Sequence, residues 1–302
     1  LYHTWNVKQI RPIEMHPYDY SQENYTELGY LDEGVTTYFG DKCWLTSGVF
    51  EWGQDVKTFH QLLHRHYTNF GVENYSVAQS SFDTWLDGYV KGTPGRKSSI
   101  YTEGALVAFM TDIFLLRNTQ NKKSLADVMT ILYQDFAKKG KGVSDLDYKN
   151  TIEQVAGVSY DEIYQSFLHG TTDYTTQLQE SLNYIGCELK TTPSTNHNEA
   201  FLGFSVTHEN NNCIVDNIFP NSIAEKNGLS INDEIMAING IKVVNNLSQW
   251  CEYFKADEIA LSVKRALGVI EKIKLKASKN IYFKTYTIDK KEDNSNFIAW
   301  KK

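Results

Sequence analysis

A histidine at position 3 and a glutamate at position 33 are of residue types that can bind a metal ion. His3 stands in "LYHTWNVKQIRP" and Glu33 in "YLDEGVTTYFGD". Imidazole and carboxylate are ordinary zinc ligands, and a catalytic zinc site usually has three protein ligands and one open position. If the residues before Leu1 were His and Glu, His3 would complete an H-E-x-x-H motif. Both histidines of that motif reach one metal ion, and its glutamate acts as a general base.

A second histidine pair, His60 and His64 in "HQLLHRH", also has the spacing that lets two side chains share a metal on one helical face. Gln61 follows His60 and cannot serve as a carboxylate base. The nearby sequence offers no third ligand. We therefore expect these two histidines to lie on a solvated helix face.

The composition sets the class of protein. The chain has 302 residues, of which 41% are hydrophobic and 22% charged, with a net charge of −7, and is long enough for two domains. An acidic chain is unsuited to bind nucleic acid through a basic face. The longest apolar run, "ALVAFMTDIFLL", contains Asp112 and is too short to span a membrane. The compartment remains open. Widely spaced cysteines predict buried free thiols at Cys43, Cys187, Cys213 and Cys251.

Residues 1–190 have the apolar spacing of helices. Two segments show it most clearly, with stripes formed by Phe59, Leu62, Leu63 and His66 and by Leu106, Phe109, Ile113 and Leu116. Ser124 and Asp127 have the spacing of a helix N-cap and its third residue. Strand signals are rare, so this half is predicted to be mostly helical.

The pattern changes after a polar stretch at residues 191–200, which we interpret as a linker. Residues 201–278 contain six short β-branched runs and two helical segments, which predict a small, partly open β barrel. Residues 279–302 form a C-terminal tail.

Several stretches of the first half closely resemble the glycyl aminopeptidases, a family of gluzincin metallopeptidases: "HTWNVKQIRP", "YLDEGVTTYFGD", "SIYTEGALVAFMTDI" and "KSLADVMTILY". The resemblance extends from Leu1 to the "FIAWKK" end and includes the order of the segments. It implies a multidomain α+β protein. Residues 1–190 would be the mostly helical, C-terminal part of a thermolysin-like zinc aminopeptidase domain.

The resemblance also implies three site residues. His3 matches the second histidine of the zinc motif, Glu33 matches the glutamate ligand, and Tyr101 in "IYTEG" matches a tyrosine that hydrogen-bonds the oxyanion in related aminopeptidases. A phenol is neutral at pH 7 and donates one hydrogen bond, which suits that role. The implied reaction removes small N-terminal residues such as Gly or Ala from peptides with a free N-terminus, through water activated by one zinc ion.

The sequence departs from the family pattern at its beginning. The first histidine and the general-base glutamate would precede Leu1, as would the β region that grips the substrate's amine in related enzymes. Two ligands hold zinc poorly. We therefore expect residues 1–302 alone to bind zinc weakly or not at all, and not to hydrolyse peptides.

The segment "FLGFSV" suggests a separate peptide-binding site. A glycine turn before an edge strand can aim backbone N–H groups at a terminal carboxylate, and the strand can then pair with the peptide. With "NSIAEKNGLSINDEIMAINGIKV", it resembles a bacterial-type PDZ domain, although Asn232 replaces the customary glycine. The resemblance implies that Leu202, Gly203 and Phe204 form the carboxylate loop.

In the same resemblance, the helix around 247–254 is the other wall of the groove, with Trp250 or Cys251 facing a ligand. The ligand would be a C-terminal peptide or the chain's own tail, which would block the groove. Three functions are therefore open. They are a zinc aminopeptidase with a PDZ domain, a non-catalytic peptide-binding PDZ protein with a degenerate peptidase-like helical domain, and a metal-free helical scaffold.

Overall fold

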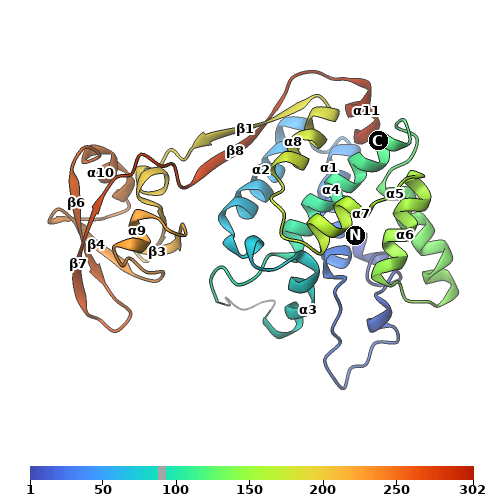
Figure 1. Cartoon of the computed structure of the whole chain (residues 1–302), viewed down its shortest axis with the longest axis horizontal. Coiled ribbons are helices and arrows are strands. Elements are labelled where there is room, and N and C mark those ends of the chain that lie inside the picture. Colours follow the sequence, from blue (N-terminus) through green and yellow to red (C-terminus); the bar gives the residue numbers. More distant parts are fainter. Residues whose placement is uncertain (88–92) are drawn as a thin grey trace. The chain divides into compact units, whose positions relative to one another are not determined.

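The computed structural model describes residues 1–87 and 93–302 and divides into two compact units. The first contains Leu1–Lys190 and Thr287–Lys302, and the second contains Thr191–Tyr286. Both chain termini lie in the first unit (Figure 1). The first unit is mostly helical and the second is a small sheet with helices, which confirms the multidomain α+β class.

The first unit is built around one buried helix, α4, with other helices packed around it (Figure 1). Its predicted apolar stripe, and the stripe predicted for α2, are both buried. His66 is buried with the apolar residues of the α2 stripe because it has a polar partner in the core: its Nδ1 lies 2.5 Å from Glu103 Oε2 of α4. The α-helices of this unit are α1 (Thr36–Thr46), α2 (Trp52–Thr68), α3 (Val77–Asp87), α4 (Ile100–Asn118), α5 (Leu125–Asp135), α6 (Asp145–Ala156), α7 (Asp161–Ile163), α8 (Thr175–Tyr184) and α11 (Ser295–Lys301).

Helix α5 begins as the sequence predicts. The Ser124 amide donates to Asp127 Oδ2 at 2.9 Å, which satisfies a backbone donor at the helix start. The next amide, that of Leu125, donates to Asp112 Oδ1 of α4 at 2.8 Å. A capping sequence and a buried carboxylate together fix where α5 starts against the central helix.

The C-terminal helix α11 is anchored in the first unit. Trp300 is buried, and its Nε1 donates to the Tyr38 hydroxyl at 2.8 Å. Tyr38 in turn donates to Asp112, which also pairs with Lys42 at 2.8 Å. Much of the predicted tail 279–302 is therefore an integral part of the helical unit.

The second unit contains all six predicted strand segments and both predicted helical segments. Its sheet has the order β2-β3-β4-β6-β7, with β5 paired to β4. Alternate strand residues pack with both helices in a single core. The elements are β2 (Phe204–Glu209), β3 (Asn212–Ile218), α9 (Ile223–Lys226), β4 (Glu234–Ile238), β5 (Ile241–Lys242), α10 (Leu247–Tyr253), β6 (Glu258–Lys264) and β7 (Ile270–Lys276).

The segment predicted as a linker is structured. Residues up to 193 belong to strand β1 (Cys187–Pro193), which pairs with β8 (Lys284–Lys290), and a π-helical turn follows at Asn198–Leu202. The polar composition suggested a linker, and no local pattern indicated a strand, because the strand that pairs with β1 lies about a hundred residues later. Three of the four free cysteines are buried as predicted, but Cys43 is exposed on α1.

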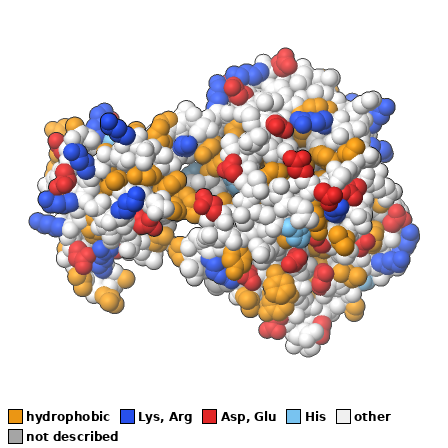
Figure 2. Space-filling model, in the orientation of Figure 1, with side chains coloured by type: hydrophobic (Ala, Val, Ile, Leu, Met, Phe, Trp, Pro, Cys, Tyr) orange, Lys and Arg blue, Asp and Glu red, His pale blue; other side chains and the backbone are white. Residues whose placement is uncertain are grey.

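Charged side chains of both signs are interspersed over the face drawn in Figure 2. Among the described residues, no helix is both long and apolar enough to cross a bilayer.

Candidate functional site

The structure brings His3 and Glu33 together. Nε2 of His3 lies 3.3 Å from Oε2 of Glu33. Nδ1 of His3 lies 3.3 Å from the carbonyl oxygen of Asn6. A carbonyl only accepts hydrogen bonds, so the Asn6 contact suits a protonated Nδ1, and Nε2 is the ring nitrogen that faces the carboxylate.

The separation of these two atoms can be compared with that of two ligands of one metal ion. Zinc bonds to imidazole and carboxylate are each about 2.0–2.2 Å long, so two tetrahedral ligand atoms lie about 3.4 Å apart. The observed 3.3 Å fits a shared zinc ion. Within residues 1–87 and 93–302, no group of three or more His, Cys, Asp or Glu side chains could hold a metal. The described residues thus bring two side chains of suitable type and spacing together and no third ligand.

Asn6 holds the two segments in register, a role that sequence reasoning missed. The side chain is buried, and its Nδ2 lies 2.7 Å from the Leu31 carbonyl, 3.2 Å from the Asp32 carbonyl and 3.1 Å from Thr36 Oγ1. These acceptors flank Glu33, which lies in a π-helical turn (Tyr30–Val35) leading into α1. Isolated π-turns are frequent at functional sites.

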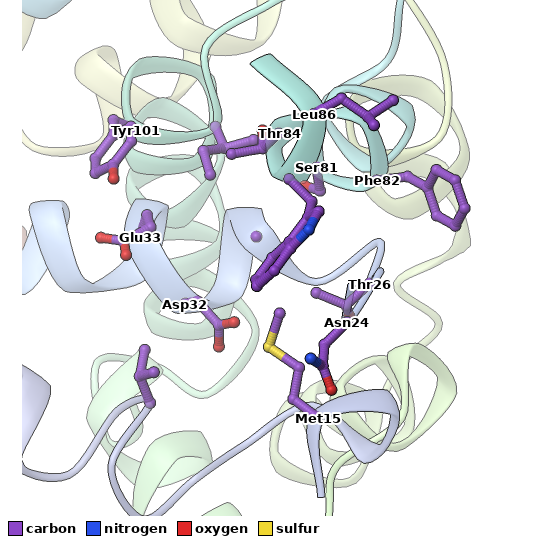
Figure 3. Close-up of a pocket in the computed structure, with 14 residues that line it drawn as sticks. Met15, Asn24, Thr26, Asp32, Glu33, Ser81, Phe82, Thr84, Leu86 and Tyr101 are labelled. Carbon is purple, nitrogen blue, oxygen red and sulfur yellow. The ribbon is translucent and has the colours of Figure 1, made fainter. Parts of the chain in front are cut away.

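Two glycines bring the Glu33 segment against the Tyr101 helix. A Cβ added to Gly34 would lie 2.4 Å from Gly104 Cα, and one added to Gly104 would lie 2.7 Å from Gly34 Cα. No other residue allows two backbones to approach so closely. Tyr101, in the first turn of α4, lines the same pocket as Glu33, and Figure 3 shows its hydroxyl directed towards the Glu33 carboxylate.

Asp32, next to Glu33, is a buried carboxyl group that the sequence did not single out. Burial raises the pKa of Asp32 well above its usual range, and the nearby Glu33 and Glu14 raise it further. Its Oδ1 has no hydrogen-bond partner among the residues that the structure describes. The adjacent acidic pair "DE" in the sequence was the available signal.

The alternative histidine pair does not form a metal site. His64 is exposed on α2, as expected, but His60 is half-buried. Nε2 of His60 accepts a hydrogen bond from the Ile288 amide at 2.8 Å, which uses the lone pair that a metal would need. The expectation of a solvated face was wrong for His60 because β8 packs over it.

In the second unit, Leu202, Gly203 and Phe204 form the turn into β2. The side chains of Leu202 and Phe204 are buried in the core. Gly203 has a φ of +83°, and an added Cβ would lie 2.2 Å from Ser222 Cβ. Both the left-handed backbone conformation and the close packing therefore require glycine at this position. The Gly203 amide donates to the Asn198 carbonyl at 2.8 Å within the turn.

Strand β2 is an edge of the sheet, since it pairs with β3 alone in the described strand order. Such an edge can pair with an extended peptide. On α10, Cys251 is buried in the core, so the idea that it faces a ligand was wrong, whereas Trp250 is half-buried against the core edge. Asn232 has a φ of +72°, the left-handed conformation that explains the customary glycine there.

Comparisons with known proteins agree with these two units. Residues 1–107 match the family model described as M61 glycyl aminopeptidase, and residues 192–263 match that of the PDZ domain. No curated protein matches the chain. The aminopeptidase N family protein from Idiomarina loihiensis is 24% identical, with a TM-score of 0.89 over 100% of this chain and 53% of that one. The chain therefore spans about half the length of that structure and shares its fold.

Other solved structures are less similar. An HtrA-type protease, AlgW, with a decapeptide is 13% identical over 37% of this chain and 36% of its own, with a TM-score of 0.23. The photosystem II D1 C-terminal processing protease is 11% identical over 58% and 44%, with a TM-score of 0.24. Both resemblances seen in the sequence are thus confirmed: residues 1–107 match the M61 glycyl aminopeptidases, and residues 192–263 match the PDZ domains.

Proposed function

We propose that this chain is part of a zinc metallo-aminopeptidase that carries a PDZ domain. His3 and Glu33 supply two zinc ligands, Tyr101 stabilises charge during the reaction, and the substrates are peptides with a small N-terminal residue such as Gly or Ala. The observation that carries the proposal is the 3.3 Å approach of His3 Nε2 to Glu33 Oε2, with Tyr101 in the same pocket as Glu33.

Each residue has a distinct task. His3 presents Nε2 because Nδ1 is held by the Asn6 carbonyl, a contact of the kind that orients metal-bound histidines. Glu33 supplies the negative charge. The Tyr101 phenol donates a hydrogen bond to the carbonyl oxygen of the cleaved peptide bond as negative charge develops on it. Zinc bound at His3 and Glu33 would act as a Lewis acid for peptide hydrolysis.

Zinc binding tests the ligand assignment directly. A polypeptide of residues 1–302 offers two ligands in this site, so we expect weak binding in competition with a chelator and no peptide hydrolysis. His3→Ala and Glu33→Gln should each lower the remaining affinity by at least about tenfold. The control His64→Ala, at an exposed histidine of the same unit, should not change it. Equal zinc affinities in all four proteins would contradict the assignment.

The role of Tyr101 is tested in the longer protein. Tyr101→Phe removes one hydroxyl and should lower kcat by about 10²–10³-fold, with a smaller effect on KM. A kcat like that of the wild type would show that Tyr101 is not the oxyanion donor.

The second unit is proposed to bind the C-terminus of a peptide along β2. The free edge of β2 supports this role, and it would be the chain's working site if the helical unit were non-catalytic. A titration with C-terminal peptides should shift the amide resonances of residues 202–206. Peptides whose C-terminus is amidated should shift them less, and equal shifts would contradict a carboxylate loop.

A further inference from the structure

The cavity beside Glu33 and Tyr101 is lined largely by apolar side chains, and the assignment of His3 and Glu33 as zinc ligands gives these side chains no role. Its volume is about 540 Å³, within the range of small-molecule sites, about 300–1,000 Å³. Apolar side chains supply much of its wall, with Met15 on one side and Phe82 and Leu86 of α3 among those on the other (Figure 3). None of the described residues that line it is Lys, Arg or His.

Apart from Asp32 and the proposed zinc ligand Glu33, the wall has polar residues that already make hydrogen bonds within the protein, such as Ser81 and Asn24. Ser81 Oγ donates to the Val77 carbonyl at 2.7 Å and accepts from the Tyr30 amide at 3.2 Å. Asn24 Nδ2 donates to the Asp19 carbonyl at 2.7 Å, and its Oδ1 accepts from the Asp19 amide at 3.1 Å. These residues offer a ligand little beyond their apolar surface.

The rim leaves large apolar side chains in solvent. Phe82, Trp85 and Leu86 are 45%, 43% and 63% exposed on consecutive turns of α3. Tyr25 stacks on Phe82 with ring centroids 4.7 Å apart, which helps to fix that ring. Exposed apolar groups gathered at the mouth of a cavity are typical of a binding site. Aromatic and thioether walls favour an aromatic ligand.

We infer that this cavity binds a large aromatic side chain of the substrate, at the residue that follows the cleaved peptide bond. The inference rests on the proposed function. If the N-terminal residue is Gly or Ala, it is too small to fill the cavity. The next residue then becomes the one whose side chain can enter a pocket bordered by Glu33 and Tyr101. Trp85 and Met15 would determine this specificity.

Equilibrium binding to residues 1–302 tests the inference without catalysis. The probes are the dipeptide amides Gly-Phe-NH2, Gly-Ala-NH2 and Phe-Gly-NH2, which lack the carboxylate that the PDZ-type loop would bind. Methyl resonances of Ile100 and Leu86, both in the wall, report occupancy. Gly-Phe-NH2 should bind at least about tenfold more tightly than Gly-Ala-NH2, and no less tightly than Phe-Gly-NH2.

Variants locate the effect. Trp85→Ala, at a partly exposed rim residue, should remove the advantage of Gly-Phe-NH2, and Thr84→Phe should do so by filling the cavity. Trp44→Ala, a control at an aromatic residue of α1 that is 50% exposed, should retain it. Equal affinities for Gly-Phe-NH2 and Gly-Ala-NH2, tighter binding of Phe-Gly-NH2, or an advantage that survives Trp85→Ala would each overturn the inference.

The two proposals fail in different ways. If the longer protein cleaves Gly-Ala-NH2 as well as Gly-Phe-NH2, the aminopeptidase function stands and the pocket assignment fails. If the longer protein cleaves neither while the selective binding of Gly-Phe-NH2 persists, the pocket stands as a binding site and the catalytic proposal fails.

Discussion

The crossing of the Glu33 turn over α4 predicts that Gly34→Ala will destabilise the helical unit. The added Cβ would lie 2.4 Å from Gly104 Cα, whereas ordinary contacts begin at 3.4 Å, so the two backbones must move about 1 Å apart. Overpacking of this kind costs about 2–3 kcal/mol of unfolding free energy. The same movement would separate Glu33 from Tyr101, and a misplacement of about 1 Å can cost about a hundredfold in rate.

Urea denaturation followed by far-UV circular dichroism, which reports mainly the helical unit, measures this loss. Gly40→Ala is the matched control, because it makes the same change in α1, where an added Cβ meets no atom within 4 Å. It should raise the unfolding free energy by about 0.5–1 kcal/mol, since alanine favours helix. If Gly34→Ala is as stable as Gly40→Ala, the close crossing is not a packing constraint and the reasoning is refuted.

Three further outcomes are expected. Because the hydrogen bond to Asp145 raises the pKa of His169, unfolding free energy measured by urea denaturation should fall as pH rises above about 6.5, and His169→Gln should abolish that fall. Gly203→Ala should destabilise the second unit in thermal melts by more than about 3 kcal/mol. Gly268→Ala, which has the same φ of +83° but no atom within 4 Å, should cost only about 1–2 kcal/mol. Trp300→Ala should lower the unfolding free energy of the helical unit by about 3–5 kcal/mol in urea; no change would contradict its role as an anchor.

Asp145, the partner of His169, contributes to the unfolding free energy with the opposite dependence on pH. Burial alone would raise the pKa of Asp145, but hydrogen bonds from His169 and from two tyrosines outweigh it and lower that pKa. The stabilisation from Asp145 is therefore present above its unfolded pKa and is lost as pH falls through the lowered folded value. An Asp145→Asn variant that remained equally sensitive to acid would place the effect elsewhere.

Local patterns predicted much of the fold. The α4 stripe from Leu106 to Leu116 is buried because apolar spacing of three and four residues puts those side chains on one helical face. Helix α5 begins directly after its N-cap residue, Ser124, because the side chain that completes the cap, Asp127, lies only three residues further on. The six β-branched runs of the second unit could be predicted as strands for the same reason, because a strand pattern is visible within a few neighbouring residues.

What the sequence did not predict depends on distant partners. Asn6 carries no local signal that its amide will bond to the segment around Glu33. Trp300 gives no indication that it will meet Tyr38. The approach of His3 to Glu33 was expected only through the family resemblance, because spacing along a chain does not fix a distance between separate turns.

The pairing of β1 with β8 makes the second unit an insertion within the first. The chain leaves the helical unit at Lys190 and returns to it at Thr287, through two strands that lie side by side. We therefore expect the helical unit to fold after the second unit is excised and these two strands are joined by a short turn. A stop codon placed after Lys190 would also delete α11 and leave the binding place of Trp300 empty. Loss of folding in such a truncation would reveal nothing about the PDZ domain.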